Sequence, residues 1–316
     1  MALLQAFVPN RGDAWRYTLD CLHETFDRLL AAPERLSQRP LLSDDHLLDL
    51  AAQPIPPAAA WLLDGYLPSA RLLGRRTAEL HLALATDTDD PAFAPEPLTA
   101  DFQAALRREM EQLADQVLAL LEARLAHLPA AARARAATLL ERRPELARRL
   151  AALTHRPMGG LRIRIHGDYH LGQVLVTDDD FMIIDFEGEP ARPLAERRQK
   201  RPALQDVAGM LRSFHYAAYA ALFDRLAKDD LPSQAAVDLE TWARYWRRWA
   251  SAAYLQSYLQ AAGDAAFLPA SATERRNLLD AMLLGKAVYE LGYELNNRPS
   301  WVGIPLQGIL HILQAS

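Results

Sequence analysis

Hydrophobic residues recur every three or four positions along most of the chain, and this spacing gathers them on one face of an α-helix. A break at Leu67-Pro68 divides one of the helical segments into two pieces. Asp13, Thr99 and Asp206 are residue types that cap helix N-termini. Residues 33–57 are rich in Pro and Ser and predict an irregular connection. Helices are predicted over residues 13–30, 61–85, 99–128, 129–154, 207–224, 235–262, 273–296 and a closing segment that ends near 313.

One stretch departs from the helical pattern. Residues 162–166, 174–177 and 181–185 are short runs rich in β-branched side chains, which are typical of strands. The run Asp178-Asp179-Asp180 is a turn signal between the last two. We therefore expect a fold that is mainly α with a small β element, in which a hairpin carries polar residues at its mouth.

The loop between the first two predicted strands carries candidate chemistry. It places a carboxylate at Asp168 and an amide oxygen at Gln173, and Asp185 follows at the end of an apolar strand. An ionisable group there is costly to bury unless something binds it. Phosphoryl transfer needs a carboxylate that accepts the proton of the attacking hydroxyl, and oxygen ligands for magnesium. We predict that Asp168 is the catalytic base and that Gln173 and Asp185 bind Mg²⁺.

The spacing of these residues matches a known kinase pattern. In protein kinases a catalytic loop H-R-D-x-x-x-x-N is followed by D-F-G. Here Gly167 replaces the Arg, Gln173 replaces the Asn, and the segment 185–188 reads DFEG. The combination is more specific than the three residues HGD alone, which recur by chance.

Four motifs, HGDYHLGQVL, IIDFEGEP, ERRQK and DVAGMLRSFHYAA, occur in this order and resemble those of the maltokinases. These carbohydrate kinases have an aminoglycoside-phosphotransferase-like fold and make maltose 1-phosphate from maltose and ATP. Members also occur fused behind trehalose synthase. The resemblance extends from residue 4 to 306. It implies ATP as donor, maltose as acceptor, trehalose synthase as a partner, and a role in making glycogen or α-glucan from trehalose.

The same resemblance implies how the domains are arranged. Residues 1–10 would be the hinge between two kinase lobes, with Gln5, Ala6 and Phe7 beside the adenine base. Residues 11–316 would form the helical C-terminal lobe. No glycine-rich phosphate loop and no strand-borne lysine precede the hinge in this sequence. We therefore expect the N-terminal nucleotide lobe to be absent from this chain.

Four residues of the predicted helix 273–296 form a candidate sugar-binding face. Lys286, Tyr289, Glu290 and Tyr293 are spaced i, i+3, i+4 and i+7 and so share one side of the helix. From the residues alone, a surface Lys–Glu pair with two inward tyrosines is the more common explanation of this pattern. The resemblance favours the sugar site, because the corresponding Lys and Tyr of the family contact maltose.

The remaining substrate candidates are charged or polar residues near the catalytic motifs. A charge run is usually a solvated loop, but this one follows the predicted metal ligand Asp185, where cations would offset phosphate charge. The family usually continues this run with Lys-x-Ser-Pro, and the Ser is missing here. The candidates are His166, Glu196, Arg197, Arg198, Lys200 and Arg212.

Composition narrows the class of protein. The chain has 316 residues, a net charge of −5 and a single cysteine, Cys21. The acidic balance argues against nucleic acid as a partner, and one cysteine excludes an internal disulfide. No apolar run is long enough to span a membrane. We expect a cytoplasmic protein.

Two alternatives to a kinase remain open. Without the lobe that covers ATP, the chain could be a non-catalytic sugar-binding or docking module associated with trehalose synthase. Alternatively, His166, Asp168, His170 and Asp185 could form the metal cluster of a hydrolase. The second is less favoured, because no further ligand occurs at the expected helical spacing.

Overall fold

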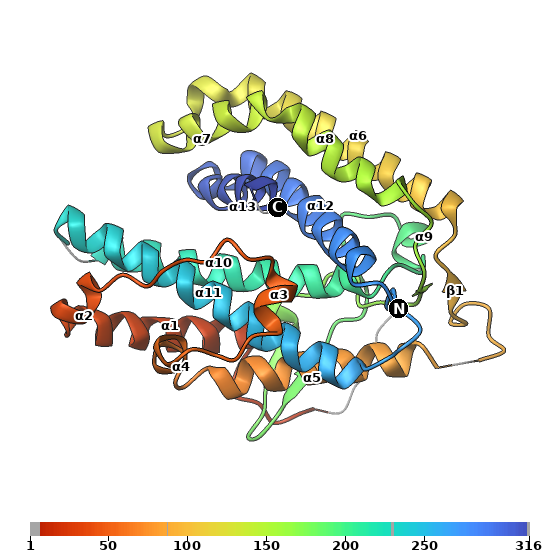
Figure 1. Ribbon diagram of the computed structural model, residues 1–316, viewed down its shortest axis with the longest axis horizontal. Helices are drawn as coiled ribbons and strands as arrows, with labels where there is room; N and C mark the ends of the chain where they lie inside the picture. Colours follow the sequence, from red (N-terminus) through yellow and green to blue (C-terminus); the bar gives the residue numbers. More distant parts are fainter. Residues whose placement is uncertain (1–6, 87, 229–230, 315–316) are drawn as a thin grey trace.

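The computed structural model describes residues 7–86, 88–228 and 231–314 (Figure 1). Gln5 and Ala6 of the predicted hinge lie outside this part of the chain, while Phe7 is described and is 85% exposed. Among the helices described, none combines the length and apolar character needed to cross a bilayer.

Helices dominate the structure, as the hydrophobic spacing predicted. The long helices are α1 (Ala14–Leu30), α5 (Leu67–Leu84), α6 (Ala100–Arg124), α10 (Leu204–Lys228), α11 (Ser233–Ala262) and α12 (Ala272–Asn297). The shorter ones are α2 (Pro33–Ser37), α3 (Leu47–Ala51), α4 (Pro57–Leu62), α7 (Ala130–Glu141), α8 (Arg143–Ala151), α9 (Leu194–Arg197) and α13 (Gly303–Gln314). Single 3₁₀ turns are η1 (Leu125–His127), η2 (Ala152–Thr154), η3 (Leu171–Gln173) and η4 (Pro299–Trp301).

The strands form two small antiparallel sheets. β3 (Val174–Val176) pairs with β4 (Phe181–Ile183), so the predicted hairpin with the Asp178–Asp180 turn is confirmed. β2 (Leu161–Arg162) instead pairs with β1 (Glu96–Pro97). The first predicted strand therefore lies outside the hairpin, and a strand pairing between distant segments is not visible in local sequence.

Local signals fixed several helix starts correctly. The Asp13 carboxylate accepts the amide of Arg16 at 2.8 Å, and the Thr99 hydroxyl accepts that of Phe102 at 3.2 Å. The prediction of an irregular connection over 33–57 was wrong in part, because α2 and α3 lie within it. Proline in the first turn of a helix loses no hydrogen bond, and Pro33 opens α2 in this way.

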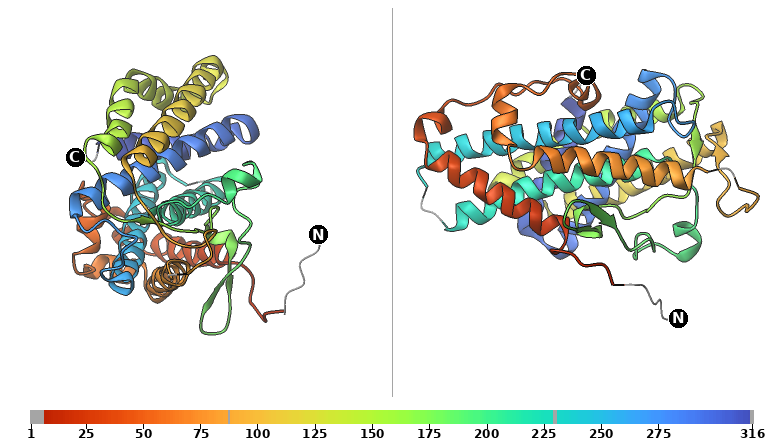
Figure 2. Two further views of the ribbon diagram at one scale, coloured as in Figure 1. Left: turned by 90° about the vertical axis from the view of Figure 1, so that its right-hand side faces the viewer. Right: turned by 90° about the horizontal axis from the view of Figure 1, so that it is seen from below.

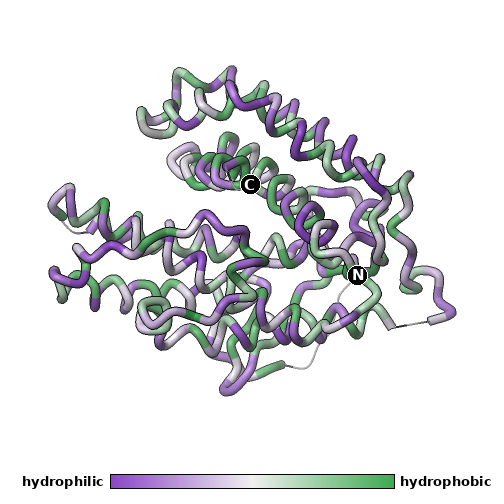
Figure 3. Tube along the Cα trace, in the orientation of Figure 1, coloured by the Kyte–Doolittle hydropathy of each residue, from purple (hydrophilic) through white to green (hydrophobic). Residues whose placement is uncertain are grey.

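The helices pack in layers around two hydrophobic clusters. In Figures 1 and 2, α1 and α5 lie on one side, α10 and α11 come next, α12 and α13 follow, and α6 to α8 cover the far side. The larger cluster joins α1, α5, α10, α11 and the first half of α12. The second joins α6, α7, α8, α13 and the second half of α12. Hydrophobic and hydrophilic residues alternate along α6 and α8, as expected for an outer layer (Figure 3).

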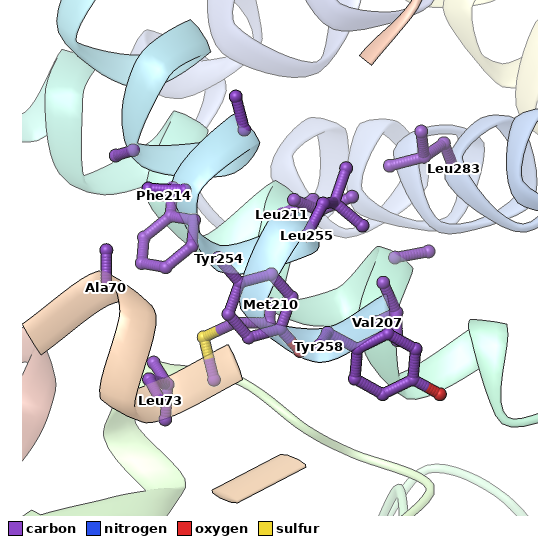
Figure 4. Close-up of a cluster of buried hydrophobic side chains, with 14 of the residues drawn as sticks. Ala70, Leu73, Val207, Met210, Leu211, Phe214, Tyr254, Leu255, Tyr258 and Leu283 are labelled. Atoms are coloured by element: carbon purple, nitrogen blue, oxygen red, sulfur yellow. The ribbon is translucent and has the colours of Figure 1, made fainter. Parts of the chain in front are cut away.

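The aromatic residues of α11 belong to the interior. Trp246, Tyr254 and Tyr258 are fully buried, and Figure 4 shows the last two beside Phe214 and Val207 of α10. Burying a large aromatic side chain stabilises a fold by a few kcal/mol. These rings fix α11 against α5 and α10, the two helices that hold the catalytic loop.

Gly74 allows α5 to approach α11 closely, which generates a stability prediction. A Cβ atom at residue 74 would lie 2.2 Å from the main-chain oxygen of Tyr254. Overpacking of this kind costs about 1–3 kcal/mol. We expect Gly74→Ala to lower the free energy of unfolding by at least that amount in urea titration.

Gly65→Ala is the matched control, because a Cβ atom there meets no atom within 4 Å. Equal stability of the two variants would contradict the close packing of α5 on α11.

Candidate functional site

A buried carboxylate holds the predicted catalytic loop, residues 166–173. Asp206, in the first turn of α10, accepts the backbone amides of His166 at 2.8 Å and Gly167 at 3.0 Å. His81 of α5 contacts the same carboxylate through Nε2 at 3.2 Å and reaches Tyr258 through Nδ1. The prediction that Asp206 caps a helix starting at 207 was wrong. The helix begins earlier, at Leu204, and the side chain faces the loop.

Two further hydrogen bonds fasten the loop to the helices. The amide of Leu171 donates to the Ser213 hydroxyl at 3.1 Å, and the hydroxyls of Tyr169 and Thr77 are 2.9 Å apart. Leu171 and Tyr169 belong to the loop, Ser213 lies on α10, and Thr77 lies on α5. Buried polar groups that find partners in this way make a loop rigid.

The predicted base Asp168 lies at the surface of this loop, half-buried. Its Oδ1 is 3.7 Å from Nζ of Lys286 on α12, and its Oδ2 is 3.9 Å from Nε2 of His170. Fold packing thus brings together a carboxylate and an amine that are 118 residues apart in the sequence. A carboxylate in this position is within reach of a hydroxyl group bound beside Lys286, as a general base requires.

The two predicted metal ligands lie side by side. Gln173 Nε2 is 3.0 Å from Oδ2 of Asp185, and Asp185 is exposed and does not point into an apolar interior. Asp185 has a φ of 63°, an uncommon conformation for a residue with a side chain. His166 Nε2 donates to the carbonyl of Ile184 at 2.8 Å and so ties the catalytic loop to this turn.

This pair fits a magnesium ion chemically. Mg²⁺ in kinases is held by one or two protein oxygens together with phosphate oxygens and water, and a half-turn of the Gln173 amide presents its oxygen beside Asp185. By contrast, the described residues contain no group of three His, Cys, Asp or Glu side chains able to hold a metal ion. The hydrolase cluster His166–Asp168–His170–Asp185 therefore finds no support.

His170 stands between these groups. Burial lowers its pKa below the ordinary value, while Asp168 and Asp185 both act in the opposite direction and Lys286 adds to the lowering. Both carboxylates thus lie within electrostatic reach of one imidazole. The imidazole is neutral at pH 7 and leaves the negative charge of the two carboxylates uncompensated on this side.

A cavity of about 520 Å³ opens beside Asp168. Tyr289 is half-buried, and burial together with the neighbouring Glu189 raises its pKa, so it remains a neutral hydrogen-bonding group. Lys286 Nζ lies 5.1 Å from the centre of the Tyr289 ring. The walls combine aromatic rings with charged groups: Asp13, Trp15, Asp168, His170, Tyr216, Lys286, Tyr289, Glu290, Tyr293, Glu294, Arg298 and Trp301.

The four residues predicted to share a face of one helix, Lys286, Tyr289, Glu290 and Tyr293, all line this cavity. Their roles stay predictions, but their convergence with Asp168 depends on the packing of α12 on α10. A smaller cavity of about 80 Å³ adjoins the first and shares Asp168, Lys286 and Tyr289 with it.

Several predicted substrate residues do not line either cavity. Lys200 is buried and donates to the Glu96 carboxylate and the Pro91 carbonyl, both at 2.7 Å. Arg212 is buried behind Glu290, with which it forms an ion pair at 2.7 Å. A buried cation needs such a partner, and these contacts give both residues a structural role. Their contact with substrate stays a prediction.

The charged residues that follow the hairpin also lie outside both cavities. Glu196, Arg197 and Arg198 are absent from the walls of both cavities, and Arg197 Nη1 donates to the carbonyl of Glu187 at 3.3 Å. The expectation that they contact substrate finds no support in the described structure. Their place in the sequence, shortly after Asp185, did not predict where their side chains lie.

Sequence reasoning missed a cluster that closes the smaller cavity. Glu109 of α6 pairs with Arg192 at 2.7 Å and Arg201 at 2.8 Å. Burial would raise the pKa of Glu109, but these two arginines hold it below its ordinary value. Trp15, Tyr216 and Trp301 were also missed as cavity residues. For Glu109, a polar residue within a largely apolar helix face was the one signal in the sequence.

No protein-family model matches the chain. A glucosamine kinase of Streptacidiphilus jiangxiensis is 26% identical over 305 residues, which cover 96% of this chain and 56% of that protein. A glucosamine kinase of Mycolicibacterium smegmatis is 32% identical over 141 residues, 44% of this chain and 32% of that protein. The chain thus spans little more than half the length of the first of these relatives.

Solved structures give the same picture. A glucosamine kinase in crystal form B superposes with a TM-score of 0.67 at 24% identity, over 98% of this chain and 60% of that one. A glucosamine kinase in complex with glucosamine, ADP and inorganic phosphate superposes with a TM-score of 0.66, over 96% and 62%. The predicted mainly helical, kinase-like lobe is confirmed as a fold. That this chain is a maltokinase stays a prediction.

The contacts of Asp206 generate a prediction about the loop. Asp206→Asn replaces one accepting oxygen by an NH₂ group that faces a backbone donor, which leaves a buried amide unsatisfied at a cost of about 1–3 kcal/mol. We expect faster hydrogen exchange at the amides of residues 166 and 167, measured by NMR or mass spectrometry.

Asp264→Asn, on an exposed turn, is the control and should leave exchange unchanged. Unaltered protection in the Asp206 variant would mean that another group holds the loop.

Proposed function

We propose that this chain is the catalytic helical lobe of an ATP-dependent carbohydrate kinase. The observation that carries the proposal is the position of Asp168. It lies on the wall of the large cavity, next to Lys286, while the adjacent loop and turn bring Gln173 to Asp185. Base, acceptor cavity and metal ligands are the parts that phosphoryl transfer requires.

Each residue of the proposed site has a distinct role. Asp168 orients the acceptor hydroxyl and takes its proton. Lys286, 3.7 Å away, contributes positive charge where the phosphate arrives. Gln173 and Asp185 hold Mg²⁺, which when bound neutralises phosphate charge. Catalysis of this kind consists mainly of positioning and electrostatic stabilisation.

We propose a sugar as the acceptor. Aromatic rings cover the apolar face of a pyranose, and charged groups bind its hydroxyls. The cavity offers Tyr289, Tyr293 and Trp301 for the first and Glu290 for the second. Maltose, phosphorylated at its anomeric hydroxyl to maltose 1-phosphate, is the acceptor that the sequence motifs favour. The cavity volume of about 520 Å³ leaves room for the two rings of a disaccharide.

Glucosamine is the second candidate, because the relatives reported above are glucosamine kinases. Glu189, Glu290 and Glu294 line the cavity and would suit an ammonium group. Association with trehalose synthase, a nucleotide hinge at residues 5–7 and a role in α-glucan synthesis rest on the sequence motifs and are proposed with the maltose reaction. A non-catalytic sugar-binding module is the contrary hypothesis.

Removal of the base tests the kinase proposal. In the protein encoded by the full reading frame, we expect Asp168→Asn to lower kcat by about 10²–10⁴-fold, because general-base assistance is lost while the binding groups remain. ATP and sugar affinities, measured by calorimetry, should change little.

Asp178→Asn, on the exposed hairpin turn, serves as the control variant. Phosphoryl transfer at wild-type rate in the Asp168 variant would disprove the assigned base. Sugar binding without any phosphoryl transfer by the wild type would favour the non-catalytic module.

Replacement of an aromatic residue tests the acceptor. Tyr293 is 47% exposed on the cavity wall, and Tyr293→Ala should weaken maltose binding by about tenfold, because covering a sugar face buries apolar area. Calorimetric titration with maltose and with glucosamine decides between the two acceptors.

Phe93→Ala is a matched control, since Phe93 is equally exposed but lies outside the cavity. Tight binding of glucosamine with no response to maltose would replace the first acceptor by the second.

A further inference from the structure

A third cavity lies on the other side of α10 from the catalytic loop. It is enclosed by α10, α11, α12, α13 and the segment that leads into α3, and it measures about 50 Å³. That space holds a few water molecules or one small ion, but no sugar. Its polar lining consists of Asp45, His46, Arg212, Arg247, Arg248, Ser251, Asp280 and His311.

Three guanidinium groups face this cavity. Arg212 and Arg248 are 3% and 4% exposed, and Arg247 lies beside Arg248 on α11. Arginines are seldom buried without partners, because desolvating an unpaired charge costs several kcal/mol. We therefore asked which negatively charged groups contact these three arginines.

Two of the arginines donate to histidines. Arg212 Nη1 is 2.6 Å from His215 Nδ1, and Arg248 Nη1 is 3.2 Å from His311 Nε2. Burial and the nearby arginines lower the pKa of His311 to about 3 and that of His215 well below its ordinary value. Both imidazoles are therefore neutral acceptors and bring no negative charge.

The carboxylates near the cavity are committed elsewhere. Glu290 pairs with Arg212 from the side of the large cavity. Asp280 is bound by His46 Nε2 at 2.9 Å, and the exposed Asp45 accepts from Gln53 at 3.3 Å. Besides His311, Arg248 donates to the main-chain oxygen of Asp45 at 2.7 Å. Burial lowers the pKa of Arg248, and the negative charges of Asp44 and Asp45 act in the opposite direction.

Arg247 is the cation left over. It forms no hydrogen bond or ion pair with the residues that the structure describes, and its Nε is buried without a partner. Burial, with smaller contributions from Arg248 and Arg212, lowers its pKa to about 9. Arg247 therefore brings to the cavity a positive charge that no carboxylate of the described residues contacts.

We propose that this cavity binds a small tetrahedral oxyanion, with inorganic phosphate as the ligand chemistry and Arg247, Arg248 and Ser251 as its donors. Guanidinium groups match the oxygen spacing of phosphate and bind it by paired hydrogen bonds. The enclosed walls exclude larger phosphate esters. Neither the proposed base nor the proposed metal ligands belong to this site.

The Arg212–Glu290 ion pair separates this cavity from the one beside Asp168. Arg212 lines the first, and Glu290 lines the second. Arg212 fits there only because residue 308 is glycine, since a Cβ atom would lie 2.1 Å from its Nη1. An anion that draws on Arg212 loosens its hold on Glu290 and so changes acceptor binding. This coupling rests on the proposed function, whereas the anion site does not.

Phosphate binding to the whole chain tests the site, without nucleotide or sugar present. We expect phosphate to raise the Tm of the wild type and to bind measurably by calorimetry. Arg247→Gln should abolish the Tm shift and weaken binding at least tenfold. Ser251→Val fills the cavity and leaves the charges in place, and it should also abolish the Tm shift and weaken phosphate binding. Loss of binding in both variants cannot then be explained by a folding defect of the Arg247 variant alone.

Two controls locate the ion. Arg108→Gln removes an exposed arginine on α6, and Lys286→Gln removes the cation beside Asp168; both should keep wild-type phosphate binding. Glucose 1-phosphate should not compete, because its sugar cannot enter. The proposal is overturned if phosphate does not bind, if both cavity variants bind it normally, or if only the Lys286 variant loses it. The first two results leave the kinase proposal untouched, whereas the third would place the phosphate beside Asp168, where the proposed kinase site expects it.

Discussion

The catalytic loop depends on one buried carboxylate. Asp206 receives two successive backbone amides, from His166 and Gly167, in a place that water does not reach. A charge in such an environment is stable only when several donors converge on it, and donors without an acceptor would be equally unfavourable. Loop and α10 therefore stabilise each other, and His81 with Tyr258 extends the same network into α5 and α11.

From this anchor the geometry of the site follows in two parts. The loop presents Asp168 and Gln173 on a rigid backbone, and the hairpin turn delivers Asp185 in an uncommon conformation. The acceptor side comes from α12, which is held by different contacts and carries Lys286 toward Asp168. The proposed kinase site thus lies where the loop held by α10 meets α12, which packs on the same helix.

Sequence patterns predicted what local physics controls. Helical spacing, the caps at Asp13 and Thr99, and the hairpin turn were all correct because each depends on residues close in the chain. The buried role of Arg212 and Lys200 could not be predicted, since a cation's partner is set by packing between distant helices. The same holds for the pairing of β1 with β2 and for the link of Glu109 to Arg201.

The two hydrophobic clusters share α6, α13 and α12, and α12 divides most evenly between them. Its first half belongs to the inner core, its second half to the outer layer, and Lys286 lies near the junction. Evolution can consequently remodel the acceptor wall by repacking α6 to α8 against the distal half of that helix, with the loop and its anchor unchanged. In the proposed kinase, such a division separates the loop that carries Asp168 from the wall that selects the acceptor.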